Sequence, residues 1–183
     1  MKVLKPIDLQ LPVWAIASPK RRDHIARVTA LLDHWAAAMA ISPGERASWH
    51  DAGLLHDSLR DAEEPLLREL SRDMQSPAEI LHGPASAARL EGLGEARRDV
   101  LDAIRWHTLG NAAWGRTGQA LFMADFLEPG RKFMVAERAW LAQMVPDDFA
   151  GVFRQVVKCR LEWSLREGKG LHAETVAMWN AVR

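Results

Sequence analysis

Apolar residues recur every three or four positions along most of this chain, and strict alternation of apolar and polar residues is almost absent. A three-to-four spacing gathers apolar side chains on one face of a helix, whereas a half-buried strand needs a spacing of two. The pattern therefore predicts an all-α fold. Beyond a helix from residue 19 to about residue 40 and another that starts near residue 43, we expect helices over about residues 94–107, 118–127, 131–144, 147–167 and 173–181.

Serine-proline pairs mark where helices are expected to begin. Ser18 precedes Pro19, and residues 42–45 (SPGE) and 76–79 (SPAE) each have the form of a capping box with proline at the first helical position. Glycine and proline also mark the expected breaks, which fall at Gly110, Pro129-Gly130, Pro146 and residues 168–170.

The length of 183 residues fits one domain, and a chain of this size buries about two-thirds of the surface that it exposes when unfolded. No repeat, linker or low-complexity tract divides it. We predict an extended N-terminal arm over residues 1–17 and one helical domain over residues 18–183.

The charge composition bears on the choice of partner. Lys+Arg and Asp+Glu number 24 each, so the formal net charge is zero. A neutral chain offers no basic surplus for a nucleic-acid polymer or an anionic membrane, and neither is expected as a partner. Any phosphate-binding site must therefore be built locally.

Three features predict a cytoplasmic protein. Charged residues and prolines interrupt the N-terminal stretch, which argues against a signal peptide. No apolar run approaches the ~18 to 20 residues that a membrane-spanning helix needs. Cys159 is the single cysteine, which excludes an intrachain disulfide and suits a reducing compartment.

Six histidine and aspartate residues follow or interrupt apolar stretches, which indicates that they point inward. His56 and Asp57 end the string AGLLHD. The other residues are His82 in ILHG, His107 in AIRWHTLG, Asp125 in LFMADFL, and His24 on the first helix. A buried imidazole or carboxylate without a partner costs about 1 to 3 kcal/mol. A shared metal site would satisfy all six, and the candidate ligands are His24, His56, Asp57, His82, His107 and Asp125.

The donor types narrow the chemistry of such a site. Mixed imidazole and carboxylate ligands suit iron, manganese, cobalt or zinc better than magnesium, and six groups can hold two divalent ions. Two ions about 3.5 to 4 Å apart can share a hydroxide near neutral pH, which suits hydrolysis of a phosphate ester or anhydride. Taken singly, however, each histidine is more often a packed core or cap residue than a ligand.

The remaining histidines are assigned to the surface or to packing. His50 and Asp51 form a second His-Asp pair, which we expect on the outer part of the helix that leads to His56. We expect His34 and His172 on helix surfaces or in helix packing.

The strings SPKRRDHIARV, AGLLHD, LHGPASA, AIRWHTLG and FMADFLEPGR occur in this order, and RLEWSLREGKGLHAETVAMWN follows them. Together they resemble the YqeK family, HD-domain hydrolases that cut diadenosine tetraphosphate symmetrically. The resemblance runs from about residue 18 to the end of the chain.

The resemblance implies a single HD-domain helical bundle and a ligand set. His24, His56, Asp57 and Asp125 match the general HD ligands, and the remaining two match the pair that completes a two-metal site, His82 and His107. It further implies that Asp57 bridges two iron ions. The implied reaction is attack by a metal-bridging hydroxide on the central anhydride of diadenosine tetraphosphate, which gives two ADP.

Two basic residues are candidates to bind the phosphates. Arg60 lies three residues past Asp57, and Arg131 follows a proline-glycine pair; a solvated helix end is the alternative for each. Asp57 and Arg60 are our candidate catalytic residues. The family carries lysine where this chain has Arg60, and a small hydroxyl residue where it has Ile25.

Other positions near the candidate ligands are expected to shape the site. Thr108 and Gly110 would form a turn with hydrogen-bond donors beside the metal, or a plain helix C-cap. The pair at residues 83–84 (GP) would turn the chain so that His82 faces inward, or break a helix. Trp114, in a loop, is the candidate to stack on a base. Four other tryptophans are expected in the core, namely Trp35, Trp106, Trp140 and Trp163.

The expected partner is a small-molecule nucleotide, and two rival functions stay open. One is an HD phosphohydrolase that acts on a nucleoside monophosphate or another dinucleoside polyphosphate. The other is a catalytically silent domain that binds a nucleotide or a protein partner. The products of hydrolysis separate the enzymes from one another.

Overall fold

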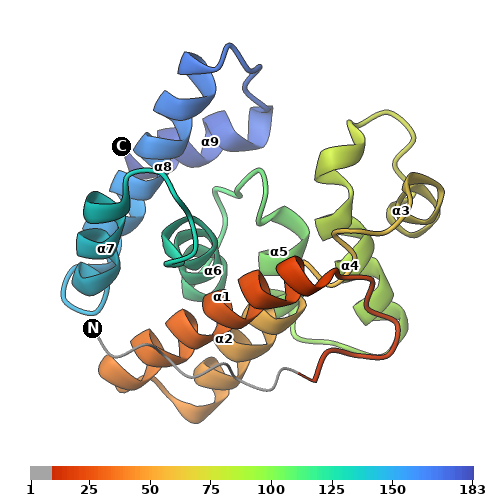
Figure 1. The fold of residues 1–183 in the computed structure, drawn as a ribbon, viewed down its shortest axis with the longest axis horizontal. Helices are drawn as coiled ribbons and strands as arrows, with labels where there is room; N and C mark the ends of the chain where they lie inside the picture. Colours follow the sequence, from red (N-terminus) through yellow and green to blue (C-terminus); the bar gives the residue numbers. More distant parts are fainter. Residues whose placement is uncertain (1–9) are drawn as a thin grey trace.

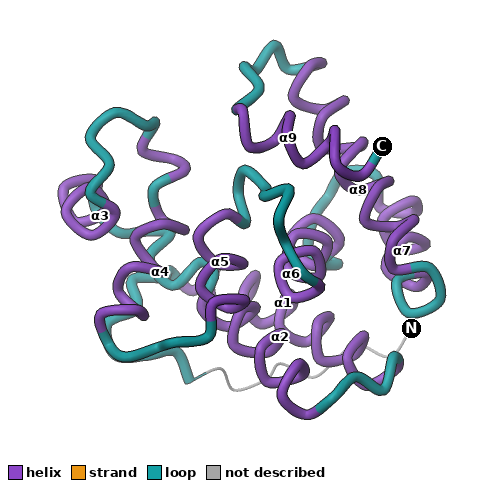
Figure 2. Tube along the Cα trace, turned by 180° about the vertical axis from the view of Figure 1, so that it is seen from behind, coloured by secondary structure: helices purple, strands orange, loops and turns teal. Residues whose placement is uncertain are grey.

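The computed structural model describes residues 10–183, so residues 1–9 of the predicted arm lie outside the described residues. The described part contains helices and no strand, which confirms the all-α prediction (Figures 1 and 2). The helices are α1 (Pro19–Ala38), α2 (Pro43–Leu55), α3 (Glu64–Ser71), the 3-10 helix η1 (Ala78–Ile80), α4 (His82–Gly92), α5 (Arg98–Trp106), α6 (Arg116–Leu127), α7 (Val135–Met144), α8 (Phe149–Arg166) and α9 (Ala173–Val182).

Two of the three predicted helix starts have the expected cap. The Ser18 hydroxyl accepts a hydrogen bond from the Arg21 N–H of α1, and the Ser42 hydroxyl accepts one from the Glu45 N–H of α2. The capping box at residues 76–79 is wrong. Asp73 accepts the backbone N–H of Ser76 at 2.9 Å, so this segment forms a turn that leads only to η1.

Helix α6 is the centre of the bundle and contacts α1, α2, α5, α7 and α8. Figure 1 shows α1 and α2 side by side, with α8 and α9 on one side of α6 and α3 and α4 on the other. The main core collects apolar side chains from every α-helix except α3, and a smaller cluster under α3 and α4 contains Leu59, Leu67, Leu81 and Ala85. Because most of α6 is surrounded, a polar side chain on its buried faces must find a partner inside the protein.

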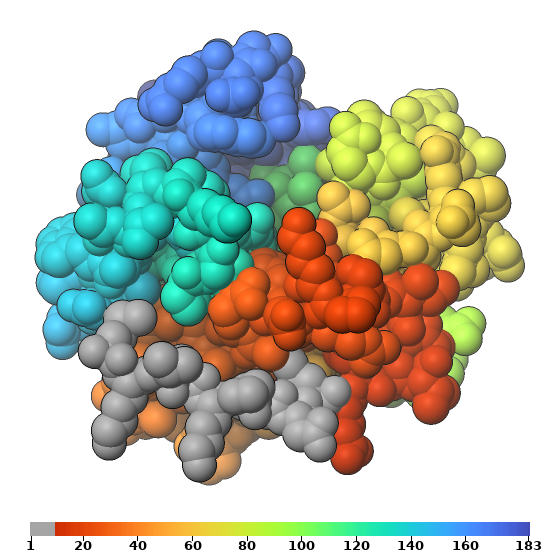
Figure 3. All heavy atoms as spheres, viewed as in Figure 1, coloured from red at the N-terminus to blue at the C-terminus, as the bar shows by residue number. Residues whose placement is uncertain are grey.

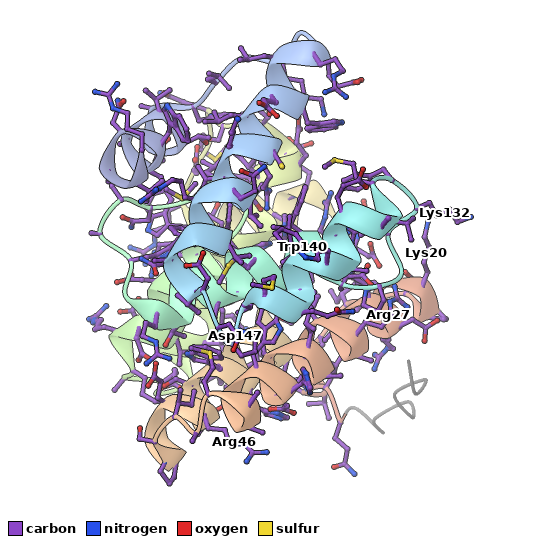
Figure 4. The ribbon with its side chains drawn as sticks, turned by 90° about the vertical axis from the view of Figure 1, so that its left-hand side faces the viewer. Lys20, Arg27, Arg46, Lys132, Trp140 and Asp147 are labelled. Carbon is purple, nitrogen blue, oxygen red and sulfur yellow. The ribbon has the colours of Figure 1, made fainter. Side chains whose placement is uncertain are left out.

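The tryptophans divide between core and surface. Trp35 is fully buried and donates its indole N–H to the Ala142 carbonyl, and Trp106 packs against the core. Trp140 is 59% exposed and Trp163 is 46% exposed, so the expectation that they lie in the core is wrong. Trp140 belongs to α7, which among residues 10–183 packs mainly on α6 and α8, and its ring stays largely exposed (Figure 4).

The chain just before α1 is tied to the segment after α2. The Ile16 N–H donates to the Ser58 carbonyl at 2.8 Å, and the Ser18 N–H donates to the Asp61 carboxylate at 2.8 Å. These bonds hold the start of α1 against the residues that follow Asp57. Among the described residues, no helix has the length and apolar character needed to cross a membrane.

Candidate metal centre

The structure brings the six candidate ligands together from five elements. His24 lies on α1, His56 and Asp57 follow the last turn of α2, and His82 is the first residue of α4. His107 caps the C-terminal end of α5, and Asp125 lies on α6. All are buried except Asp125, whose side chain is 13% exposed. Residues far apart in sequence therefore meet in one polar centre inside the bundle.

Asp57 faces two pairs of histidines with its two carboxylate oxygens. Oδ2 lies 3.7 Å from Nε2 of His24 and 3.6 Å from Nε2 of His56. Oδ1 lies 3.2 Å from Nε2 of His82 and 3.4 Å from Nε2 of His107. Within each group of three, the ligand atoms lie within 4.8 Å of one another. The geometry suits two neighbouring ions that share one carboxylate.

Asp125 supplies a second carboxylate on one side of the centre. Its Oδ1 lies 3.2 Å from Nε2 of His24, and Arg131 Nη2 lies 2.6 Å from the same oxygen. The group around His24 and His56 is therefore richer in carboxylate than the group around His82 and His107. A hard divalent cation would be held more strongly on that side.

Hydrogen bonds fix which histidine nitrogen faces the centre. Nδ1 of His56 lies 2.8 Å from the Gly53 carbonyl, and Nδ1 of His107 lies 2.8 Å from the Ile104 carbonyl. A carbonyl only accepts, so in both rings Nδ1 carries the proton and Nε2 presents a lone pair to the centre. Metal-bound histidines are commonly oriented in this way.

The contact between His82 and His107 also points to a cation. Their Nε2 atoms lie 3.0 Å apart, so His82 must either place a proton between them or share a cation with His107. Nδ1 of His82 is buried and has no hydrogen-bond partner among residues 10–183. No described acceptor therefore stabilises a proton on Nδ1. The residues present therefore fit a metal site on this side as well.

Gly83 allows the start of α4 to touch the end of α5. A Cβ at this position would lie 2.8 Å from the Ile104 carbonyl oxygen and 3.2 Å from Cε1 of His107. Residues 83 and 84 lie inside the first turn of α4, so the expectation of a turn or a helix break at this pair is wrong. The glycine instead serves the close packing that brings His82 to His107.

Glu128 is a component of the site that was not predicted. Its side chain is 2% exposed, and Oε1 lies 3.1 Å from Nδ1 of His24. Its other oxygen accepts from Nε of Arg27 at 2.5 Å and from the Gly130 N–H at 2.6 Å. The available signal was spacing, because Glu128 lies three residues after Asp125 on the same side of the chain.

Two arginines that were not predicted approach the carboxylates. Arg21 Nη1 lies 2.6 Å from Oδ2 of Asp57. Arg160 of α8 lies 3.6 Å from Oδ2 of Asp125, and its guanidinium lies over the Phe122 ring and donates to the Thr108 carbonyl. Arg21 had a signal, since it precedes His24 by three residues on one helix face. Arg160 had none, because only the fold brings α8 to this centre.

Burial and mutual charge set the protonation of the centre. Burial lowers the pKa of His56 to about 4, so this ring is neutral at pH 7. Burial opposes the charge of His24, yet hydrogen bonds to Asp125 and Glu128 outweigh it and raise the pKa to about 9. Despite burial, neighbouring histidines hold the pKa of Asp57 and Asp125 well below the usual range, with help at Asp125 from Arg131. The carboxylates are ionised, as metal ligands must be, while His24 must lose a proton to bind.

The predicted substrate positions lie at different distances from this centre. Arg131 contacts Asp125 directly, and the Thr108 hydroxyl lies 3.3 Å from Nε2 of His107. Arg60 follows Asp57 in a turn, and its charge adds to the effect of burial in lowering the pKa of His82. Gly110 closes α5 with a positive φ of 90°, and its N–H donates to the Trp106 carbonyl, as in a helix C-cap.

Trp114 is too deeply buried to stack on a base, contrary to the prediction. It is 8% exposed, its ring packs on Phe122 and against Gly118, and its indole N–H donates to the Asp102 carbonyl. A ring this buried offers no open face to a base. The loop position suggested exposure, but α5 and α6 close over the indole.

The second His-Asp pair lies away from the centre. His50 pairs with Asp33 at 3.1 Å, and Asp51 pairs with Arg97 at 2.7 Å, both partly exposed on the outer side of α2. His34 and His172 are exposed. These positions agree with the expectation from the sequence.

The surface near the centre is hollowed. In the space-filling view a recess lies between the C-terminal helices (blue), the α3–α4 region (yellow) and the start of α1 (red), and green atoms of the α5 region lie in it (Figure 3). The partly exposed arginines of the site, Arg21, Arg131 and Arg160, come from α1, the α6–α7 connection and α8. These guanidinium groups lie at the partly exposed side of the centre.

Three known proteins that share one name are similar in sequence to this chain. No family model matches the chain. Three relatives carry the name bis(5'-nucleosyl)-tetraphosphatase, symmetrical. The protein from Halalkalibacterium halodurans is 27% identical over 72% of this chain and 73% of its own, and the one from Bacillus subtilis is 22% identical over 70% and 73%. The protein from Staphylococcus aureus is 36% identical, and the match spans 61% of this chain and 60% of that relative.

A solved structure shares the fold. The crystal structure of a predicted HD superfamily hydrolase involved in NAD metabolism, from Clostridium acetobutylicum, superposes with a TM-score of 0.77 over 90% of this chain and 89% of that chain. The two sequences are 22% identical, so this likeness concerns the fold alone.

Proposed function

We propose that this chain is a YqeK-like HD-domain hydrolase and that it hydrolyses diadenosine tetraphosphate at the central anhydride to give two molecules of ADP. The name shared by the three relatives supports this substrate and this symmetry of cleavage. The observation that carries the proposal is Asp57, whose two oxygens face separate histidine pairs. Two divalent ions about 3.5 to 4 Å apart can act together on a phosphate, and a shared carboxylate of this kind would hold them close to one another.

The chain supplies the ligands and a positive frame. His24, His56, Asp57 and Asp125 would hold one ion, and His82, His107 and Asp57 would hold the other. When bound, two such ions would polarise a phosphate and provide a hydroxide near neutral pH. Iron is our proposal for the ions, and manganese, cobalt and zinc suit the same donors.

The arginines would bind the negatively charged phosphates of the substrate. A tetraphosphate chain carries several negative charges, and Arg21, Arg131 and Arg160 lie at the carboxylates that hold the ions. Planar guanidinium groups bind phosphate oxygens in pairs and would align the chain for attack. We propose Arg60 as a further phosphate contact on the His82 side, with Thr108 as a hydroxyl partner at His107.

Symmetry decides the products. Diadenosine tetraphosphate is symmetric about its central bridging oxygen. Water attack on either inner phosphorus, with that oxygen leaving, gives one ADP that carries the new oxygen and a second ADP that carries the old one. Departure of an outer bridging oxygen would instead give ATP and AMP. We also propose that this reaction takes place in the cytoplasm, where the single buried cysteine stays reduced.

The deciding experiment combines metal analysis with product analysis. Protein purified without chelator is assayed for metal, and its products from diadenosine tetraphosphate are separated in oxygen-18 water. We expect about two metals per chain, ADP as the initial nucleotide product, and one labelled ADP per turnover. Equal initial amounts of ATP and AMP would exclude central cleavage. No turnover of any dinucleoside polyphosphate by metal-replete protein would favour another nucleotide as the substrate.

A further inference from the structure

Arg138 is a buried arginine on α7 that contacts none of the six candidate metal ligands. It is 2% exposed, although it carries a full positive charge. Among residues 10–183, no carboxylate lies within ion-pair distance of its guanidinium. A charged group buried in this way needs hydrogen bonds to replace its hydration.

The guanidinium finds its partners in one short segment. Nε donates to the Phe126 carbonyl at 2.7 Å, and Nη1 donates to the carbonyls of Arg131 at 3.0 Å and Phe133 at 3.2 Å. Nη2 donates to the Glu128 carbonyl. All four acceptors belong to residues 126–133, which form the end of α6 and its connection to α7. We call this segment the α6–α7 connection.

Arginine suits this task better than other residues. The last carbonyls of a helix have no partner within the helix, and Phe126 and Glu128 lie at the end of α6. A planar fork of five N–H donors can reach several of them at once, whereas a lysine ammonium cannot match that spread. The Phe126 and Phe133 rings flank the guanidinium, with centroids 5.8 and 4.9 Å from Cζ. A single side chain therefore bonds four backbone carbonyls of the connection.

The same connection carries two groups of the candidate metal centre. The Glu128 carboxylate contacts Nδ1 of His24, and the Arg131 guanidinium contacts Oδ1 of Asp125. Arg138 bonds the backbone carbonyls of both residues. Figure 4 shows the connection, near Lys132, beside the part of α1 that carries Arg27, which pairs with Glu128.

We propose that Arg138 is a positioning residue, which fixes the backbone of the α6–α7 connection so that Glu128 orients His24 and Arg131 reaches Asp125. It touches no ligand itself and acts through these two residues. The inference about metal binding does not depend on the identity of the substrate, and only its kinetic consequence rests on the proposed function. Losing a group that orients a metal ligand typically costs about 10- to 100-fold in metal affinity or activity.

The test separates positioning from plain stability. Arg138→Met keeps the size and removes the donors, Arg138→Lys keeps the charge and removes the fork, and Leu141→Ala is the control. Leu141 is buried one turn further along α7 and offers no donor to the connection. For each full-length variant we would measure urea unfolding, the binding and visible spectrum of Co²⁺, and kcat and KM for diadenosine tetraphosphate.

We expect Arg138→Met to weaken Co²⁺ binding by about 10-fold or more and to alter the cobalt spectrum. Arg138→Lys should fall between this variant and wild type. Leu141→Ala should lose stability and keep wild-type Co²⁺ affinity and spectrum. If Arg138→Met does not fold, Arg138→Lys decides by the same measurements.

Wild-type Co²⁺ affinity and spectrum in a folded Arg138 variant would overturn the inference. So would an equal change in Leu141→Ala, because loss of stability alone would then explain it. Failure of the proposed function looks different. Wild-type protein that binds Co²⁺ but does not turn over diadenosine tetraphosphate would refute the substrate, while the effect of Arg138 on the cobalt spectrum would remain.

Discussion

A Cβ atom at Gly83 would lie 2.8 Å from the carbonyl oxygen of Ile104, so the first turn of α4 rests directly on the last turn of α5. The backbone oxygen of Ile104 also accepts from Nδ1 of His107. One carbonyl thus meets the start of α4 and orients a candidate metal ligand. A side chain at position 83 would push apart the two helices that bring His82 and His107 together.

We therefore expect Gly83→Ala to destabilise the protein by about 1 to 3 kcal/mol, as in other overpacked sites. It should also weaken metal binding on the His82 side, because the Nε2 atoms of His82 and His107 would separate. Urea unfolding and metal titration measure the two effects. Gly92→Ala on the same helix is the control, since nothing lies within 4 Å of a Cβ there. A Gly83→Ala protein as stable as Gly92→Ala would contradict the packing argument.

Replacing the shared carboxylate should remove both metals. Asp57→Ala takes away the oxygens that face both histidine pairs, and we expect hydrolysis to fall by more than about 100-fold, since changes outside the ligand shell already reach that size. Metal content by mass spectrometry and product formation are measured together. Asp51→Ala, which breaks only the partly exposed pair with Arg97, should keep both metals. The reverse result would show that the metal-binding pair is His50-Asp51 and not His56-Asp57.

His82 should matter for one of two metals. In His82→Ala we expect one site to weaken while the group around His24 and His56 stays partly filled, because that group has its own carboxylate in Asp125. The metal-to-chain ratio after dialysis is the measurement, and His34→Ala on the exposed side of α1 is the control. Two retained metals and normal activity would eliminate His82 as a ligand.

Metal binding should release a proton from His24. The pKa of about 9 means that this ring is protonated below pH 9 in the metal-free protein, and a metal needs its lone pair. Metal affinity should therefore rise with pH up to about 9 and level off above it. Calorimetry at pH 7.5 in buffers of different ionisation enthalpy counts the protons released.

Glu128→Gln provides the matched test of that argument. Removing a carboxylate that raises the pKa of His24 should reduce the proton release at pH 7.5. Binding without proton release in the wild type would show that His24 is already neutral. Equal release in wild type and Glu128→Gln would show that Glu128 has no part in setting the charge of His24.

Helical periodicity predicted the long helices well, and it failed where a segment is short or lies at an edge. Helix α3 buries only Leu67, so its pattern gave little signal. The serine-proline pair before η1 looks like a helix start, but the Asp73 carboxylate competes for the Ser76 N–H. Trp140 has helical spacing with apolar neighbours, and only the packing of whole helices decides that its face of α7 stays open.

Sequence also predicted which ligand candidates would meet. Five of them follow or interrupt an apolar stretch, whereas His24 follows charged residues on the first helix and is indicated by the family resemblance. Their role as ligands stays a prediction. The residues around them depend on tertiary contacts: Arg160 reaches Asp125 from the C-terminal part of the chain, and Arg138 acts through backbone carbonyls that carry no sequence signature. Trp114 also depends on tertiary contacts: its position in a loop suggested exposure, but the helices around it bury the ring.

The spread of the ligand candidates along the chain constrains when the centre can form during synthesis. His24 emerges from the ribosome early and Asp125 late, so no nascent chain shorter than this span presents the complete set. The main apolar core also draws on α8, which is made later still. Metal loading should therefore wait until α8 has been made and has packed onto the core, and the ion that is bound should reflect the supply at that stage.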